Sequence, residues 1–213
     1  MILALAAALL LALVAGPVQP KPPVLENETV SVMRYRLSPG EGFEFPADRT
    51  PQLVVYLSKA VARIRSNGET SDVRPNAGDV TFVPKGQSYA VQNTGMSPFD
   101  VLTIWINPAR PGAAAAPPTE APPGITRTTL VDNSDVRVVR VRFAPGSREP
   151  IHTHPNDLLT VQLTAGTLEM SVGAAQASGQ QPVGFTTFLP RNVPHAYISK
   201  TELPFELLSI SIK

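Results

Sequence analysis

The chain has 213 residues, of which 43% are hydrophobic and 16% charged, and its formal net charge at pH 7 is +1. This balance argues against a nucleic-acid or anionic-membrane binder, because such proteins carry a basic excess. Cysteine is absent, which excludes disulfides, thiolate metal sites and a cysteine nucleophile. The 23 prolines disfavour a helical bundle and favour short strands joined by turns.

Residues 2–15 form an unbroken apolar run. The run is shorter than the ~20 residues of a membrane-spanning helix, and it leads into a Val-Ala-Gly tripeptide at 14–16, whose small residues suit a signal peptidase. We therefore expect 1–16 to be a secretory signal peptide and the mature protein, beginning near Pro17, to be periplasmic or secreted without a stable membrane span. No Lys or Arg precedes the run, so an uncleaved anchor is the alternative.

Two halves of the remaining chain match each other at a constant offset of 106 residues. Arg34 falls on Arg140, for example, and Gly78 falls on Gly184. The register holds without an insertion, which chance similarity between two strand-rich segments would not give. The sequence therefore predicts a duplicated domain.

A stretch rich in Pro and Ala, 107–124, separates the two copies. Such stretches are extended spacers and have no apolar period. We place a linker there, with an N-terminal domain at 24–106 and a C-terminal domain at 125–213.

Each copy has the pattern of short strands. Residues 33–37 and 139–143 alternate apolar with charged side chains, which predicts one buried face and one wet face. Gly, Pro and Asn interrupt the runs at short intervals, and no sustained 3.6-residue period follows the N-terminal run. We expect an all-β fold: a sandwich, jelly roll or small barrel.

All three histidines, His152, His154 and His195, lie in the second copy. His152 and His154 are at i and i+2, so on a strand their imidazoles face the same side. With His195 from a distant strand they form a candidate three-nitrogen site for one divalent transition metal: Fe, Mn, Cu, Ni or Zn. Three unrelated histidines are the alternative, but their concentration in two short segments favours the metal.

The segment 146–166 resembles the first sequence motif of the cupin superfamily. That motif reads Gly, five residues, His-x-His, three or four residues, Glu, six residues, Gly. The position of its Glu falls at Leu159, so the usual fourth ligand is missing. Asp157 shares the strand parity of Leu159 and is a candidate displaced ligand or acid/base group; the alternative is a solvated turn residue.

The segment 184–199 resembles the second cupin motif. Its positions are held by Gly184, Pro190, Asn192 in place of a Gly, His195, and Ser199 in place of an Asn. In the first copy 78–93 resembles the same motif, with Tyr89 at the His position. The other two histidines correspond there to Pro46 and Asp48, so that copy is expected to hold no metal.

The resemblance covers nearly all of the predicted mature chain and implies a two-domain cupin, in which two tandem jelly-roll barrels carry a metal in the C-terminal barrel alone. It also implies that the fused pair supplies the packing that single cupins often obtain by dimerising, so we expect a monomer or weak homodimer. Five further residues near the motifs are candidates for assisting the chemistry of the site or attracting a substrate. For each of them, packing or surface exposure is the alternative. They are Tyr197, Gln162, Glu169, Arg148 and Arg191.

The function expected is that of an exported metal-binding bicupin, with a dioxygenase-type oxidoreductase acting on a small molecule as the first hypothesis. Three neutral imidazoles leave an ion its full charge and open positions, as Lewis-acid or oxygen chemistry requires. A non-catalytic metal- or ligand-binding module of the cell envelope is the second hypothesis, since the acidic ligand is missing and the first site is lost.

Overall fold

The structure, a computed structural model, describes residues 22–47, 50–107 and 121–213. All regular secondary structure within these ranges is β-strand. Consistent with this, the described part of the chain holds no helix with the length and hydropathy of a membrane span. The predicted signal peptide and most of the predicted linker lie outside the described residues and stay predictions.

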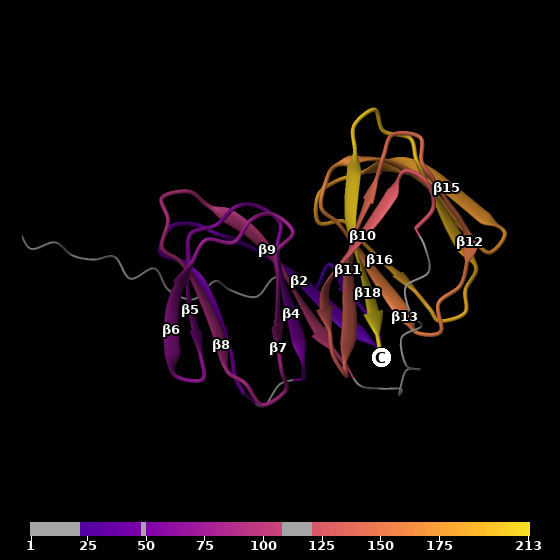
Figure 1. The fold of residues 1–213 in the computed structure, drawn as a ribbon. Coiled ribbons are helices and arrows are strands. Elements are labelled where there is room, and N and C mark those ends of the chain that lie inside the picture. The colour runs from indigo at the N-terminus through magenta and orange to yellow at the C-terminus, as the bar shows by residue number, and fades with distance from the viewer. Residues whose placement is uncertain (1–21, 48–49, 108–120) are drawn as a thin grey trace, which may run out of the picture.

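The first copy forms two antiparallel sheets that enclose an apolar core (Figure 1, indigo to magenta). The five-stranded sheet has the order β1-β2-β9-β4-β7 and the four-stranded sheet the order β3-β8-β5-β6. The strands are β1 Leu25–Glu26, β2 Val30–Leu37, β3 Gly42–Phe45, β4 Gln52–Tyr56, β5 Ala62–Ser66, β6 Glu69–Val73, β7 Val80–Val83, β8 Tyr89–Asn93 and β9 Phe99–Ile106.

The second copy repeats this topology strand for strand. Its sheets have the orders β10-β11-β18-β13-β16 and β12-β17-β14-β15. The strands are β10 Ile125–Asp132, β11 Val136–Phe143, β12 Arg148–His152, β13 Asp157–Gln162, β14 Gly166–Val172, β15 Ala175–Gln181, β16 Thr186–Leu189, β17 His195–Ser199 and β18 Phe205–Ile212. The predicted all-β fold of two tandem jelly rolls is confirmed.

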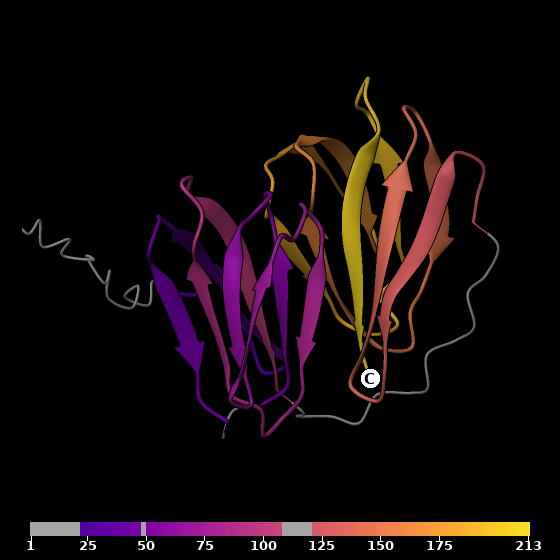
Figure 2. The ribbon, with the colours of Figure 1, turned by 60° about the vertical axis from the view of Figure 1, so that its left-hand side comes forward.

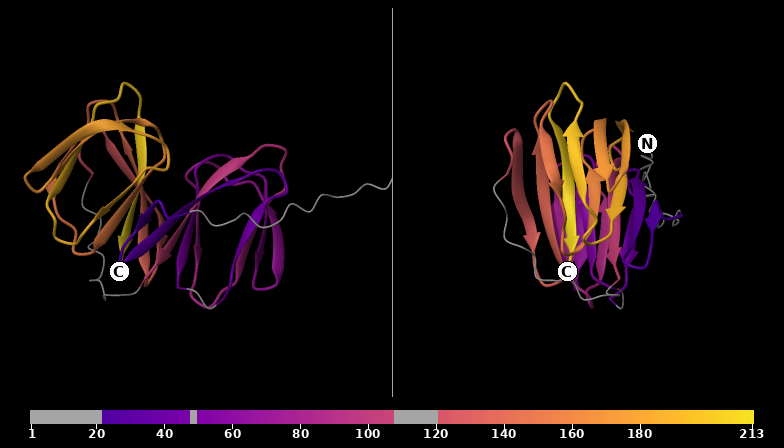
Figure 3. Two further views of the ribbon diagram at one scale, coloured as in Figure 1. Left: turned by 180° about the vertical axis from the view of Figure 1, so that it is seen from behind. Right: turned by 90° about the vertical axis from the view of Figure 1, so that its right-hand side faces the viewer.

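The two barrels pack side by side through their five-stranded sheets (Figure 2). One apolar core belongs to both sheets, and its fully or nearly fully buried members are Val30, Val32, Leu53, Val55, Leu57, Leu102, Ile104 and Ile106 with Val136, Val138, Leu159, Val161, Leu163, Leu208, Ile210 and Ile212. Figure 3 shows, in its right-hand view, one barrel in front of the other across this contact. These sheets are therefore buried on both faces.

The alternation predicted over 139–143 is observed, and the contact with the other barrel buries the residues just before it. On β11, Val141 and Phe143 face the core of their own barrel, as the alternation predicted. On the opposite face Val136 and Val138 are fully buried against the other barrel. That face is exposed to solvent only at the C-terminal end of the strand, where Arg142 pairs with Glu206 at 3.1 Å.

The repeat makes the contact nearly symmetric. Arg34 donates to the carbonyl of Val183 at 3.1 Å, and its counterpart Arg140 donates to the carbonyl of Ala77 at 3.0 Å. Each guanidinium also lies over the glycine that follows its carbonyl partner in the chain. A Cβ on Gly78, for example, would stand 1.8 Å from Arg140 Nη2. Glycine is thus required there by close approach as well as by its φ of 84°.

Candidate metal centre

The structure brings the three histidines together at one end of the C-terminal barrel. His152 is the last residue of β12, His154 lies in the loop that follows, and His195 begins β17. Pairing of β12 with β17 sets His152 directly opposite His195. The candidate ligand nitrogens of all three lie within 4.8 Å of one another, with His152 Nε2 and His154 Nε2 3.0 Å apart.

Backbone carbonyls orient two of the rings. Nδ1 of His152 lies 2.8 Å from the carbonyl of Pro150, and Nδ1 of His195 lies 3.0 Å from that of Val193. A proton held on Nδ1 leaves the Nε2 lone pair free for a metal. Nε2 of His195 is buried and has no hydrogen-bond partner among the described residues. Converging nitrogen lone pairs with an orphaned buried acceptor fit a divalent cation.

Burial favours the neutral form of two of the rings, those of His154 and His195. Burial, reinforced by the neighbouring histidines, lowers the pKa of His154 to about 4. Burial also lowers the pKa of His195. Protons would therefore compete with a metal at these two imidazoles only at a lower pH than the ordinary imidazole pKa of ~6.5 suggests.

A cavity of about 510 Å³ opens from the histidines into the barrel. Its walls combine apolar side chains, hydroxyls and two guanidinium groups, and include Val139, Val141, Phe143, Leu158, Leu207, Thr160, Tyr197, Ser209, Arg127 and Arg137. Such a mixture is typical of small-molecule sites. Burial, with the nearby Glu149, raises the pKa of Tyr197, so its hydroxyl stays protonated and can donate.

Of the five candidate helpers, the structure places Tyr197 alone on the cavity wall. Gln162 is buried against Gln181, with 2.5 Å between their side-chain amides. Glu169 pairs with Lys200 at 3.1 Å. Arg148 is exposed, and Arg191 binds Asp157. These four belong to packing, surface or inter-strand contacts.

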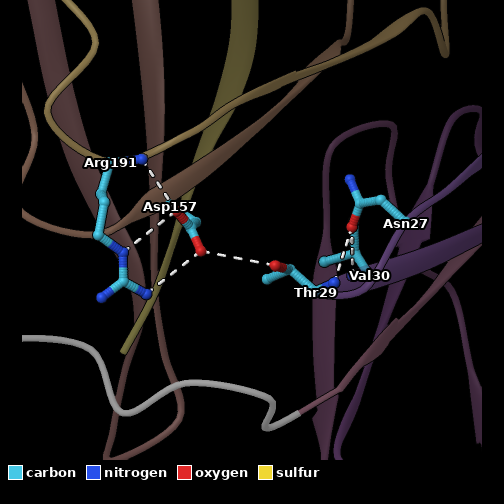
Figure 4. Close-up of polar contacts among 5 residues, drawn as sticks. All are labelled: Asn27, Thr29, Val30, Asp157 and Arg191. Atoms are coloured by element: carbon cyan, nitrogen blue, oxygen red, sulfur yellow. Dashed lines mark hydrogen bonds and ion pairs between the residues drawn. The ribbon is translucent and has the colours of Figure 1, made fainter.

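Asp157 is neither a metal ligand in this geometry nor a solvated turn residue. Its carboxylate accepts from the backbone NH of Arg191 at 2.8 Å and from the Arg191 guanidinium at 3.3 Å (Figure 4). The hydroxyl of Thr29, which belongs to the other barrel, lies 3.5 Å away. Asp157 therefore ties the loop before β17 to the start of β13 and to the N-terminal barrel. The same loop donates from Asn192 NH to the carbonyl of His154 at 2.8 Å.

Replacing Asp157 by Asn is expected to destabilise the protein by about 1–3 kcal/mol without lowering its metal content. Burial opposes ionisation, but the bonds from Arg191 outweigh it and hold the pKa of Asp157 below the ordinary value. The wild-type carboxylate thus stabilises the fold above the ordinary carboxyl pKa, and this contribution is lost as pH falls through the lowered pKa. Urea unfolding between pH 7 and 3 should show that acid loss in wild type and not in D157N. A drop in metal content in D157N at pH 7 would contradict this role.

The structure also explains why the position of the motif's Glu holds a leucine here. Leu159 is fully buried in the core between the barrels, whereas its neighbour Leu158 faces the cavity. No carboxylate reaches the histidines from this strand.

Sequence reasoning missed Glu149, which faces the cavity and is 7% exposed. Glu149 lies three positions before His152, and strict alternation would put the two on opposite faces. The β12–β17 register shifts between Glu149 and His152, however, and this bulge turns both inward while Ile151 points out, 74% exposed. Pro150 inside a short strand was the one available sign of the bulge.

In the N-terminal barrel the corresponding space is filled. Tyr89, the counterpart of His195, is buried in an aromatic core with Phe45, Tyr56 and Trp105. Pro46 cannot ligate, and Asp48 lies outside the described residues.

Substituting Tyr89 by His is expected to add no metal, because no second imidazole is within reach. The metal content per chain should equal that of wild type. An extra equivalent of metal in Y89H would show a latent second site.

Comparisons with known proteins give one relative by sequence and several by fold. No family model matches the chain. The beta-alanine degradation protein BauB of Pseudomonas aeruginosa is 31% identical over 91 residues, which are 43% of this chain and 96% of that protein. One copy of the repeat thus corresponds to the whole of that relative in length.

Solved structures align over both barrels. A cupin 2 conserved barrel domain protein from Leptotrichia buccalis covers 92% of this chain and 92% of its own, at 18% identity and a TM-score of 0.61. The salicylate 1,2-dioxygenase of Pseudaminobacter salicylatoxidans aligns at 13% identity and a TM-score of 0.66, over 87% of this chain and 71% of its own. The protein is a tandem β-barrel protein with a three-histidine group in its second barrel. Both barrels have the fold of these cupin structures, and the chain belongs to the family of the beta-alanine degradation protein BauB.

Proposed function

We propose that the protein is a metal-dependent oxidoreductase of the dioxygenase type, acting on a small anionic molecule in the C-terminal barrel. The observation that carries this proposal is the three-histidine group in the wall of a cavity lined by both apolar and cationic side chains. A divalent ion held there would supply Lewis acidity and, if redox-active, reactivity toward dioxygen.

The chain's own residues fit binding of a small acid. Arg127 and Arg137 bring positive charge to a cavity that has a single acidic side chain among its described lining residues, Glu149. Apolar walls exclude water around this charge, which strengthens its attraction for a carboxylate. The hydroxyls of Thr160 and Tyr197 can orient a polar substituent.

The relatives support this class of substrate. The structural neighbour is by name a salicylate dioxygenase, and one of its structures is an adduct with gentisate. The name of the curated relative refers to beta-alanine degradation. All three compounds are small carboxylic acids.

Oxygen uptake tests the proposal. Protein loaded in turn with Fe²⁺, Mn²⁺, Cu²⁺, Ni²⁺ or Zn²⁺ is supplied with salicylate, gentisate, beta-alanine and related small acids in an oxygen-electrode cell. We expect uptake that requires both a redox-active metal and one class of acid, and that is absent with Zn²⁺. Tight acid binding without uptake for any metal would favour the non-catalytic binding module.

Export is a separate proposal, supported by the apolar run at 2–15 and the tripeptide at 14–16. N-terminal sequencing of natively expressed protein should return a start near Pro17. An intact Met1 would contradict cleavage.

A further inference from the structure

Glu149 is a buried carboxylate beside the histidines that the first cupin motif does not account for. We propose that Glu149 supplies the acidic ligand of the metal centre, replacing the Glu that the motif places on the following strand. The inference rests on the proposed function, since it requires a metal at the three histidines.

The distance between donor atoms permits a shared ion. Glu149 Oε1 lies 4.0 Å from His152 Nε2. Two donors that share one ion, each at roughly 2.0–2.2 Å from it, are at most about 4.4 Å apart. The bulge between the two residues faces both side chains toward the cavity, so Glu149 lies beside the group of histidine nitrogens.

No other acidic side chain in the described part of the chain is placed to do this. Asp157 is bound by Arg191 and Thr29 and is absent from the cavity wall. The strand that carries the motif's Glu presents Leu158 and Thr160 to the cavity. Among the acidic groups of the described residues, Glu149 alone lines the cavity.

Arg127 holds the carboxylate when no metal is bound. Its Nη2 lies 2.5 Å from Glu149 Oε1, and both side chains are largely shielded from water. A buried carboxylate needs a cationic partner, and the guanidinium and a metal ion are alternative partners for the same oxygen. A site that contains the divalent ion, Arg127 and Glu149 has a net positive charge. This charge favours an anionic ligand.

Titration of the metal-free protein with Co²⁺ tests the assignment through affinity and the d–d absorption spectrum. Four proteins are compared: wild type, E149Q, R127M and E206Q. Glu206 is the matched control, because it also pairs with an arginine, Arg142, but on the outer surface of the barrel. Thermal unfolding with and without Co²⁺ checks that each variant folds.

We expect E149Q to bind Co²⁺ at least about tenfold more weakly than wild type, with an altered d–d spectrum. R127M should keep the wild-type spectrum and bind as tightly or more tightly, because the competing guanidinium is gone. E206Q should match wild type in both respects. Co²⁺ should raise the melting temperature more in R127M than in E149Q, even where the metal-free forms are destabilised.

Unchanged affinity and spectrum in E149Q would overturn the assignment. An equal loss of Co²⁺ affinity in E149Q and R127M would also overturn it, because the ion pair would then only shape the cavity wall. Failure of wild type to bind Co²⁺ would instead refute the metal site of the proposed function, so the two failures are distinct.

Discussion

Replacement of His154 by Ala is expected to reduce bound metal from one equivalent per chain to almost none and to abolish any metal-dependent activity. The loss follows because His152 and His195 would remain as the only imidazoles, and two such ligands hold a divalent ion far more weakly than three. The fold should survive, because the cores of both barrels are apolar and His154 belongs to none of their clusters.

Circular dichroism and metal analysis of the same preparation check this result. The matched control is Thr153→Ala, which alters the exposed residue between the two histidines. It should retain full metal content. Metal unaffected in H154A would show that the centre is wrongly assigned.

Truncation of Ile104 or Ile210 to Ala should each destabilise the whole protein by about 2–5 kcal/mol. The two residues are equivalent in the repeat, both are fully buried, and both lie in the core that the barrels share. Because neither sheet can bury its outer face without the other, we expect the two barrels to unfold in one cooperative transition that either substitution shifts equally.

Chemical denaturation followed by far-UV circular dichroism measures this effect, with Trp105 fluorescence as a local probe of the N-terminal barrel. Ile151→Ala is the control, since that side chain is 74% exposed, and it should change stability little. Two separate transitions, with I104A affecting one and I210A the other, would contradict the shared core.

The sequence was sufficient for the architecture because its signals are long-range and redundant. A repeat register maintained from Arg34 and Arg140 to the ends of both copies requires two like folds. The motifs around His152, His154 and His195 pointed, without any knowledge of packing, to three residues whose ring nitrogens the structure places within 4.8 Å of one another.

What the sequence could not provide depends on local backbone geometry and on the partner surface. Glu149 was missed because a β-bulge interrupts the two-residue period. That period is what predicts which side chains of a strand point into the barrel. Asp157 has the parity expected of the motif's acidic position, but that face of the strand meets the N-terminal barrel, where Thr29 lies. The burial of Val138, just before the alternating stretch 139–143, likewise depends on the neighbouring sheet.

Elemental analysis of protein purified without an affinity tag tests the central claim most directly. The account predicts about one divalent transition metal per chain, either as isolated or after reconstitution. Substoichiometric metal that does not rise on reconstitution would contradict it and show that the three-histidine group is vestigial.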